Sequence, residues 1–249
     1  MGILRKETFV CVDCESTGLD PETDHIIEVA AVHFTFDEII DRYETLVDPG
    51  VPIPAESMAI HHITEEMVEG KPKIKTILPE LIDFIGSATV VGHGVLFDLQ
   101  LIANAAKRHD IPCNLANQNF FDTLRLARYY GRSPINSLEE LRKHFNIPAE
   151  GAHRAMSDVI VNVEVFKQLC RNYKTVQEVE KILSKPVRLK NMPLGKHKGR
   201  LFSDIPTDYL KWAANKDFDN DLLFSIRSEL KKRKKGGLFT QATNPFHNL

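Results

Sequence analysis

The first strand of the fold is predicted in the stretch Phe9-Val10-Cys11-Val12-Asp13-Cys14-Glu15-Ser16-Thr17-Gly18. Its first half is apolar, as expected of a buried strand that Asp13 closes. Glu15 follows two residues later, and residues i and i+2 of an extended segment point to the same face. Two carboxylates on one face repel each other unless a cation lies between them. The stretch therefore predicts a buried strand with an acidic, cation-binding end. Ser16-Thr17-Gly18 then turns the chain and leaves both carboxylates at the edge of the sheet.

Further strands and helices follow in alternation. Strands rich in apolar residues are predicted at 26–36 and 42–47, and the short links between them favour antiparallel neighbours. Two shorter strands are predicted at 89–92 and 119–122. Helices are predicted from apolar periodicity at 75–85, 99–107, 123–130 and 152–172. The order βββ, then αβαβ, then helices predicts an α/β fold with a mixed five-stranded sheet flanked by helices.

Two local patterns predict where helices begin. Pro79 is tolerated only in a first turn, so the helix whose apolar face ends at Ile85 is expected to begin near Lys75 or later. Ser137-Leu138-Glu139-Glu140 has the pattern of a capping box. In such a box Ser137 accepts hydrogen bonds from first-turn amides and Glu140 reaches back to the amide of Ser137.

The composition is that of a globular protein without a membrane span. No apolar run approaches the roughly 20 residues that cross a bilayer. The first residues have no apolar stretch of signal-peptide length, so a cytoplasmic location is the default expectation. Cys11 and Cys14 form a C-x-x-C pair without a second ligand pair at zinc spacing, which favours two small apolar strand residues over a metal or redox site.

Charge is divided unevenly along the 249 residues. Residues 1–180 contain 17 Lys and Arg and 28 Asp and Glu, a net charge of −11, whereas residues 181–249 contain 15 and 6, a net charge of +9. We therefore expect four segments: a first domain at 1–173, a connection with a short helix at 174–190, a small basic domain at 191–235, and a flexible tail at 236–249.

Two more carboxylates and a histidine stand near predicted helix starts. Asp98 lies five residues after His93, and Asp158 lies five residues after His153. Five residues along a regular helix would turn His153 about 140° away from Asp158, so His153 is expected in the lead-in loop. Singly, these residues fit a helix cap, a solvated first turn and a structural histidine. The joint pattern favours a catalytic site.

Three ordered motifs carry a resemblance to a known family. The chain resembles the DEDDh exonucleases, which include the proofreading epsilon subunit of bacterial replicative DNA polymerase, over about residues 7–172. The motifs are Val12-Asp13-Cys14-Glu15-Ser16-Thr17-Gly18-Leu19, Val91-Gly92-His93-Gly94-Val95-Leu96-Phe97-Asp98 and Ala152-His153-Arg154-Ala155-Met156-Ser157-Asp158. Ala59-Ile60-His61-His62-Ile63-Thr64 resembles a substrate-loop segment of the same family.

The resemblance implies a ribonuclease-H-like fold and a two-metal hydrolysis of phosphodiester bonds with Mg²⁺ or Mn²⁺. It implies that Asp13 bridges both metals, that Glu15 and Asp158 hold the metal of the nucleophilic water, and that Asp98 supports the second metal. His153 would be the general base for that water. The terminal nucleotides would contact Thr17, Gly18, Leu19, His61 and Phe97. Core packing is an equally good interpretation for Leu19 and Phe97.

Two positions depart from the family pattern. Gly94 stands where the family usually has Asn, and His62 stands where it usually has Gly. Both positions are expected near the substrate, so they bear on substrate preference more than on activity.

The basic C-terminal segment resembles a small domain of unknown function that is often appended to such exonucleases. The turn at 195–199 and the lysine-rich run at 231–235 fit either solvated surface or phosphate contact, and the excess of positive charge favours nucleic acid. Gln241-Ala242-Thr243-Asn244-Pro245-Phe246 weakly resembles a sliding-clamp motif, and a flexible terminus is the better interpretation.

The sequence thus predicts a metal-dependent 3′→5′ exonuclease that acts on single-stranded DNA or RNA 3′ ends, with DNA favoured. An RNA-trimming enzyme of the same superfamily is the nearest alternative, since recognition of the 2′-hydroxyl depends on pocket shape. A nucleic-acid-binding module without catalytic activity is a less favoured alternative, because all four carboxylates and His153 are present. A DNA polymerase or sliding clamp is a conceivable partner.

Overall fold

The computed structural model describes residues 2–133, 135–148, 154–216 and 218–242. The chain divides into two compact units, Met1–Leu183 and Ser184–Leu249, and each is described by itself. The first unit is the α/β fold that the sequence predicts, with a mixed five-stranded sheet and flanking helices. It includes α8, Val176–Leu183, the short helix expected in the connection at 174–190.

The sheet has the order β3-β2-β1-β4-β5. β1 pairs antiparallel with β2, β2 pairs antiparallel with β3, and the pairs β1–β4 and β4–β5 are parallel. The five strands are β1 Phe9–Ser16, β2 Ile26–Phe34, β3 Ile39–Leu46, β4 Thr89–Gly92 and β5 Phe120–Asp122. The short links between β1, β2 and β3 produce the antiparallel part, as predicted.

β1 is longer than the apolar pattern predicts. It continues past Asp13 to Ser16 because β2 keeps pairing with it, with Asp13 opposite Ala30 and Glu15 opposite Glu28. On its other edge, β1 pairs with β4 only from Phe9 to Cys11. The second half of β1 therefore projects beyond β4, and its free edge is available to side chains from the helices.

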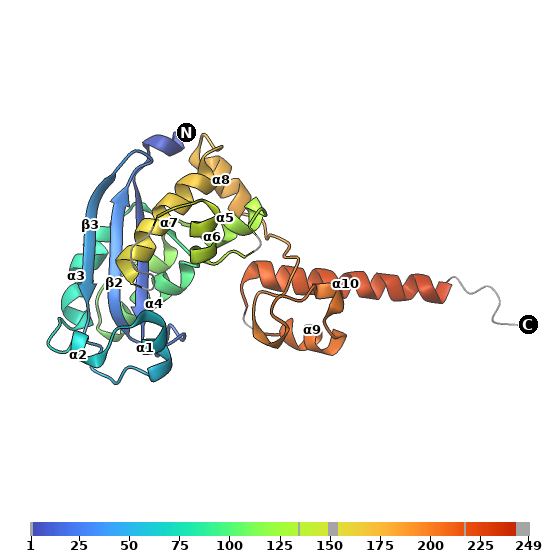
Figure 1. Cartoon of the computed structure of the whole chain (residues 1–249), viewed down its shortest axis with the longest axis horizontal. Coiled ribbons are helices and arrows are strands. Elements are labelled where there is room, and N and C mark those ends of the chain that lie inside the picture. The colour runs from blue at the N-terminus through green and yellow to red at the C-terminus, as the bar shows by residue number, and fades with distance from the viewer. Residues whose placement is uncertain (1, 134, 149–153, 217, 243–249) are drawn as a thin grey trace, which may run out of the picture. The chain divides into compact units, whose positions relative to one another are not determined.

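Helices cover both faces of the sheet (Figure 1). Phe9 and Cys11 of β1 belong to the core beneath α5, α6 and α7, whereas Val10, Val12 and Cys14 belong to the core beneath α3 and α4. These helices are α3 Ile74–Ile85, α4 Leu96–Arg108, α5 Thr123–Tyr130, α6 Leu138–His144 and α7 Ala155–Cys170. Strand alternation then places Asp13 and Glu15 on the α7 face.

The start of α3 differs from its prediction. The helix begins at Ile74, and Pro79 lies in its second turn rather than its first. The cost of the missing proline amide is offset by burial, because Ile77, Leu78 and Leu81 pack fully into the sheet core on that side.

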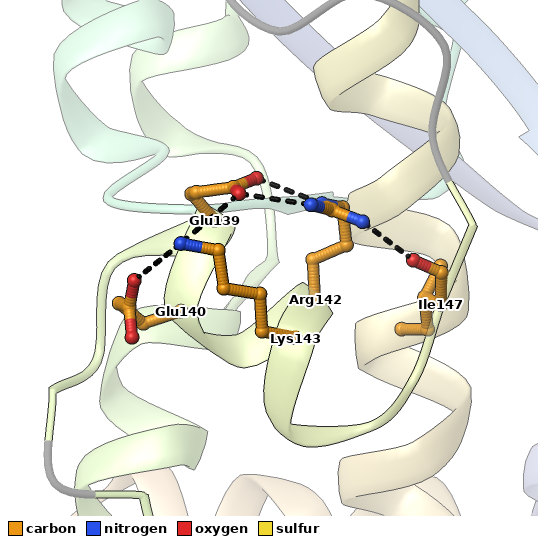
Figure 2. A network of polar contacts seen from close by, with 5 residues as sticks. All are labelled: Glu139, Glu140, Arg142, Lys143 and Ile147. Carbon is orange, nitrogen blue, oxygen red and sulfur yellow. Dashed lines mark hydrogen bonds and ion pairs between the residues drawn. The ribbon is translucent and has the colours of Figure 1, made fainter.

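The predicted capping box of α6 is wrong. Ser137 is the N-cap, but among the described residues its hydroxyl makes no capping hydrogen bond. Figure 2 shows the reason, since both glutamates turn toward cations of their own helix. Glu139 binds Arg142 at 2.7 Å, Glu140 binds Lys143 at 2.9 Å, and Arg142 also donates to the carbonyl of Ile147.

A separate small core closes one end of the first unit. Ile27, Ile53, Ile63 and Val68 are buried together where α1, Ala55–His61, and α2, Glu65–Val68, follow β3. Three-residue 3₁₀ helices also occur in this unit, η1 at Leu4–Lys6 and η2 at Leu115–Asn117. In the part of the chain that is described, no helix combines the length and apolarity needed to cross a membrane.

The second unit has a core of its own. It contains η3 Gly195–His197, η4 Phe202–Asp204, α9 Thr207–Ala213 and α10 Asn220–Ala242. Its buried apolar residues are Met192, Phe202, Ile205, Leu210, Ala213, Leu222 and Ile226. α10 runs beyond the basic run at 231–235, where we expected it to end, and its backbone is helical through Ala242. Lysine and arginine have high helix propensity, so such a run extends a helix rather than ending it.

The aromatic cluster under α7 gives a test of this packing. Phe166 is fully buried and lies 5.2 Å from Phe9 and 5.9 Å from Phe34 between ring centroids. Phe166→Ala is expected to lower the free energy of unfolding by about 3–5 kcal/mol. Ile60→Ala, at a helical residue with 58% exposure, should change it by less than about 0.5 kcal/mol. Urea denaturation measures both, and an equal loss would contradict the assignment of the core.

Candidate active site

Three predicted carboxylates meet at the acidic end of β1. Asp13, Glu15 and Asp158 each offer an oxygen, and these oxygens all lie within 4.8 Å of one another. β1 supplies the first two on its α7 face, and the first turn of α7 supplies Asp158. The i, i+2 spacing on a strand and a helix start above it are therefore sufficient to assemble the group.

Asp98 lies beside this group but outside it. It is 5% exposed in the first turn of α4, and its Oδ1 accepts a hydrogen bond from the amide of Cys14 at 3.0 Å. That amide lies on the edge of β1 that β4 leaves unpaired. The carboxylate therefore binds the backbone between Asp13 and Glu15 and approaches the group from the opposite face of the sheet.

Another carboxylate orients the α4 side of the site. Asp122 ends β5 and accepts hydrogen bonds from the amide of Leu124 at 2.8 Å and the amide of Gly94 at 2.9 Å. It thus caps α5 and also holds the loop that leads into α4. Because Asp98 lies in the first turn of α4, Asp122 helps to fix its position.

The clustered carboxylates raise one another's pKa values. Burial, with the charges of Asp98 and Glu15, raises the pKa of Asp13 well above its usual range. Burial and the charge of Asp158 raise the pKa of Glu15 to about 7. Burial raises the pKa of Asp98 to about 8. A bound cation would reverse these shifts, since it favours the charged form of each group.

A buried ion pair that the sequence analysis missed adjoins the cluster. Glu28 is fully buried opposite Glu15 and binds Arg154 at 3.0 Å through Nε. Its Oε2 also accepts the amide of Ala155, the first residue of α7, at 3.0 Å. Glu28 thus anchors the start of the helix that carries Asp158, and Arg154 lowers the pKa of Glu15 against its neighbours' effect.

The predicted general base lies outside the described residues. His153 directly precedes Arg154 in the sequence, and Arg154 is the N-cap residue of α7. The helix begins at Ala155, later than the predicted start at 152, because Glu28 accepts the amide of Ala155 in place of an earlier helical turn.

The three turn residues after Glu15 have different environments. The hydroxyl of Thr17 donates to Asp24 at 2.8 Å and accepts the amide of His25, so it builds the turn. A Cβ added at Gly18 would lie 2.5 Å from the Asp24 carboxylate, which requires glycine there. Leu19 is 89% exposed, so core packing is excluded for it.

The other two predicted substrate contacts are less accessible. Phe97 packs partly against the core beneath α3 and α4. His61 is 2% exposed, and its Nδ1 accepts the amide of Ile63 at 3.0 Å. Its Nε2 has no hydrogen-bond partner among the described residues. Burial lowers the pKa of His61, which keeps the ring neutral.

Both departures from the family pattern occupy left-handed backbone. His62 has a φ of 59° at the C-cap of α1, and Gly94 has a φ of 76°. Glycine and asparagine are the residues that adopt this conformation most readily. The exchange of Gly for His at one position and of Asn for Gly at the other therefore preserves the backbone path.

The C-x-x-C pair is structural. Cys11 lies in the core on the α7 face and Cys14 in the core on the α4 face, because three residues along a strand reverse the side. All four cysteines are free thiols, and burial raises the pKa of Cys11 and Cys14. The apolar interpretation of this pair is confirmed.

The site fits a hard divalent cation. Its converging ligand atoms are carboxylate oxygens, the type that Mg²⁺ and Mn²⁺ prefer. The raised pKa values of Asp13 and Glu15 reflect burial and repulsion by neighbouring carboxylates, and a bound cation would offset both effects. The described residues offer no thiolate or imidazole within this group of three.

The ion pair beside the site should contribute to stability. Glu28→Gln removes the charge but keeps the shape, and it is expected to lower the free energy of unfolding by about 1–3 kcal/mol. The matched control is Glu139→Gln, at the surface pair with Arg142 in Figure 2, which should cost less than about 1 kcal/mol. Urea denaturation measures the free energy of unfolding of both variants. Equal losses in the two variants would contradict a special role for Glu28.

Stability without metal should fall as pH rises. The pKa values of Asp13, Glu15 and Asp98 are raised in the folded state, so that state holds protons that the unfolded chain has released above about pH 4. The stabilising effect of the protons on Glu15 and Asp98 is lost as pH rises through about 7–8. In EDTA, the melting temperature of the wild type should fall relative to that of Asp13→Asn between pH 5.5 and 8.5. Parallel curves for the two proteins would refute the electrostatic description.

Comparison with known proteins agrees with this geometry. Residues 10–166 match the RNase_T family model, described as Exonuclease. Residues 180–230 match a second model, described as Putative quorum-sensing-regulated virulence factor. The first match covers more than half of the chain and includes Asp13, Glu15, Asp98 and Asp158.

Relatives include subunits and domains of replicative polymerases. The chain is 36% identical over 160 residues to the DNA polymerase III subunit epsilon of Aquifex aeolicus, covering 64% of this chain and 78% of that protein. It is 34% identical over 196 residues to the PolC-type DNA polymerase III of Clostridium perfringens, covering 76% of this chain. The aligned region spans only 13% of that polymerase.

Solved structures with the same fold are exonucleases. Exonuclease X in complex with 5′ overhanging duplex DNA aligns with a TM-score of 0.55 and 27% identity, over 70% of this chain and 98% of that one. A complex of E. coli exonuclease I with single-stranded DNA has a TM-score of 0.61 at 18% identity, over 72% of this chain and 42% of that one, which supports the fold alone. With its carboxylate site inside the matched region, the chain belongs to the RNase T exonuclease family, whose members use divalent metals, and is a metal-dependent exonuclease.

Proposed function

We propose that this exonuclease hydrolyses phosphodiester bonds one at a time from the 3′ end of single-stranded nucleic acid, with DNA favoured, and releases nucleoside 5′-monophosphates. The convergence of Asp13, Glu15 and Asp158 within 4.8 Å is the observation that carries the proposal. Such a cluster of oxygens suits metal-assisted attack of water on a phosphate.

Two Mg²⁺ ions, which Mn²⁺ can replace, are the proposed cofactors. When bound, they activate a water molecule and neutralise charge on the attacking and leaving oxygens. Asp13 would hold both ions, and Glu15 and Asp158 would hold the ion that activates the attacking water. Asp98 would support the other ion, and its hydrogen bond from the Cys14 amide keeps its carboxylate in one orientation.

His153 is the proposed general base that takes a proton from the attacking water. The family motif supports this role, and so does its place in the sequence next to Arg154. Because Glu28 binds Arg154 and the amide of Ala155, the chain directly after His153 is fixed relative to Asp158.

Leu19 is the strongest of the proposed substrate contacts. Its 89% exposure, next to the turn that Thr17 and Gly18 build, leaves an apolar side chain available to a terminal base. Phe97, one residue before Asp98, is proposed as a second apolar contact. His61 is proposed to contact the substrate through its Nε2, which has no hydrogen-bond partner among the described residues. The contact forms when a substrate atom comes within reach of Nε2 or when the side chain moves toward the substrate.

DNA is favoured over RNA because the relatives are named as DNA polymerase subunits and the compared exonucleases are bound to DNA. Work beside a DNA polymerase or sliding clamp, in the cytoplasm, is the cellular setting that these names suggest. An RNA-trimming activity is the second candidate function, and direct comparison of the two sugars distinguishes them.

A cleavage time course tests the proposal. DNA and RNA single strands of equal sequence, labelled at the 5′ end, should shorten from the 3′ end with Mg²⁺ and stay intact in EDTA. Asp13→Ala should abolish cleavage, and His153→Ala should slow it by about 10²–10⁴-fold with binding retained. Asp37→Ala, at an exposed turn residue, is the matched control and should leave the rate unchanged.

The outcomes are distinct. Wild-type rates from pure Asp13→Ala would refute the metal-bridging role. Intact substrate in every lane, with Mn²⁺ also tried and binding still detected by mobility shift, would replace the enzyme with a binding module.

A further inference from the structure

The second unit exposes Trp212 of α9 beside Tyr209, which itself packs partly against the core of the unit. Trp212 is 51% exposed, and its ring lies 5.2 Å from the half-buried ring of Tyr209 between centroids. Leu210 and Ala213 of the same helix are fully buried in the core of the unit. Because these two residues close the core face of α9, packing alone does not account for an exposed tryptophan at position 212.

Lysines flank both rings. Lys196 Nζ lies 5.7 Å from the ring centroid of Tyr209, and Lys216 Nζ lies 5.0 Å from that of Trp212. Lys196 belongs to η3, whose His197 also packs edge-on against Tyr209 at 4.4 Å. The basic turn at 195–199 therefore borders the aromatic pair on the side of Tyr209, and Lys216 borders it on the side of Trp212.

The arginines nearby serve the fold instead. Arg233 donates to Thr207 Oγ1 and to the carbonyls of Phe202 and Ser203. Arg200 donates to the carbonyl of Asp204. The side chains next to the rings are lysines with flexible stems and compact charges, which suit phosphates that vary in position.

The charge of the unit matches a polyanion. Residues 184–249 contain 14 Lys and Arg and 6 Asp and Glu, a net charge of +8, whereas residues 1–183 contain 18 and 28, a net charge of −10. The catalytic unit therefore repels a polyphosphate except at its metal site. Attraction over longer distances has to come from the basic unit.

We propose that Tyr209, Trp212, Lys196 and Lys216 form a stacking surface that binds single-stranded nucleic acid through its unpaired bases. Exposed aromatic rings stack on bases of any sequence, and adjacent cations contact the phosphates between them. The inference rests on the proposed function in that the bound strand is the exonuclease substrate. A protein partner is the other kind of occupant that the test separates.

Trp212 is the single tryptophan of the chain, so it reports on its own surface. In EDTA, where no strand is cut, titration of the full chain with an oligothymidylate should quench tryptophan fluorescence to saturation. A duplex of equal length should quench far less, because its bases are already stacked. Unchanged fluorescence while a labelled oligonucleotide binds, or equal quenching by the duplex, would overturn the proposal.

Variants locate the effect. Trp212→Leu keeps an apolar side chain and should weaken oligonucleotide binding about tenfold, as measured by anisotropy of a labelled strand. The matched control is Tyr129→Leu, at a 55% exposed aromatic residue of the first unit, which should bind like the wild type. The double variant Lys196→Ala with Lys216→Ala keeps the tryptophan signal and should reduce the salt dependence by about one unit of slope. Wild-type affinity in Trp212→Leu, with circular dichroism confirming its fold, would refute stacking and favour a protein partner.

The stacking surface and the proposed exonuclease function can be refuted independently of each other. Loss of quenching with intact cleavage of short strands would refute the stacking surface alone. Quenching without any cleavage would refute the proposed exonuclease function and leave the surface in place.

Discussion

Mutual repulsion of carboxylates on one face of β1 is the constraint around which the first unit is arranged. Asp13 and Glu15 share that face with Glu28 across the strand pair, and Asp158 joins them from α7. Glu28 is neutralised by Arg154 and by the amide of Ala155. Glu28 therefore has protein partners and orients the helix, while the repulsion among Asp13, Glu15 and Asp158 is what a bound cation would offset. That division explains how several carboxylates can gather at one end of a folded sheet.

The projection of β1 beyond β4 is what lets side chains from both faces reach one place. Where β4 stops, the amide of Cys14 has no strand partner on that edge, and Asp98 of α4 supplies one. Asp122 then fixes the loop before α4 through the amide of Gly94. The topology thus replaces a strand-to-strand hydrogen bond with one to a carboxylate, next to the end of β1 that carries Asp13 and Glu15. A longer β4 would satisfy that amide and displace Asp98.

Periodicity and motif spacing were sufficient for the order of the strands, the mixed sheet and the gathering of Asp13, Glu15 and Asp158, but they missed α1 and α2. They failed where a contact between distant residues decides the outcome. The end of β1 depends on continued pairing with β2, and the start of α7 depends on Glu28. Glu28 could have been identified from the sequence, because it is the single charged residue in the apolar run of β2. The capping box failed because Arg142 and Lys143, one turn on, compete for the same glutamates.

The family departures at His62 and Gly94 carry a related lesson about what a substitution near a site means. Each position has a positive φ, so the allowed residues are chosen first by the backbone and only then by the substrate. Gly94 has open space where a side chain would begin, and asparagine there would project a polar group beside the loop that Asp122 holds. The chain therefore has no polar side chain at position 94, and under the proposed function a difference in substrate preference would arise from that missing group rather than from altered catalysis.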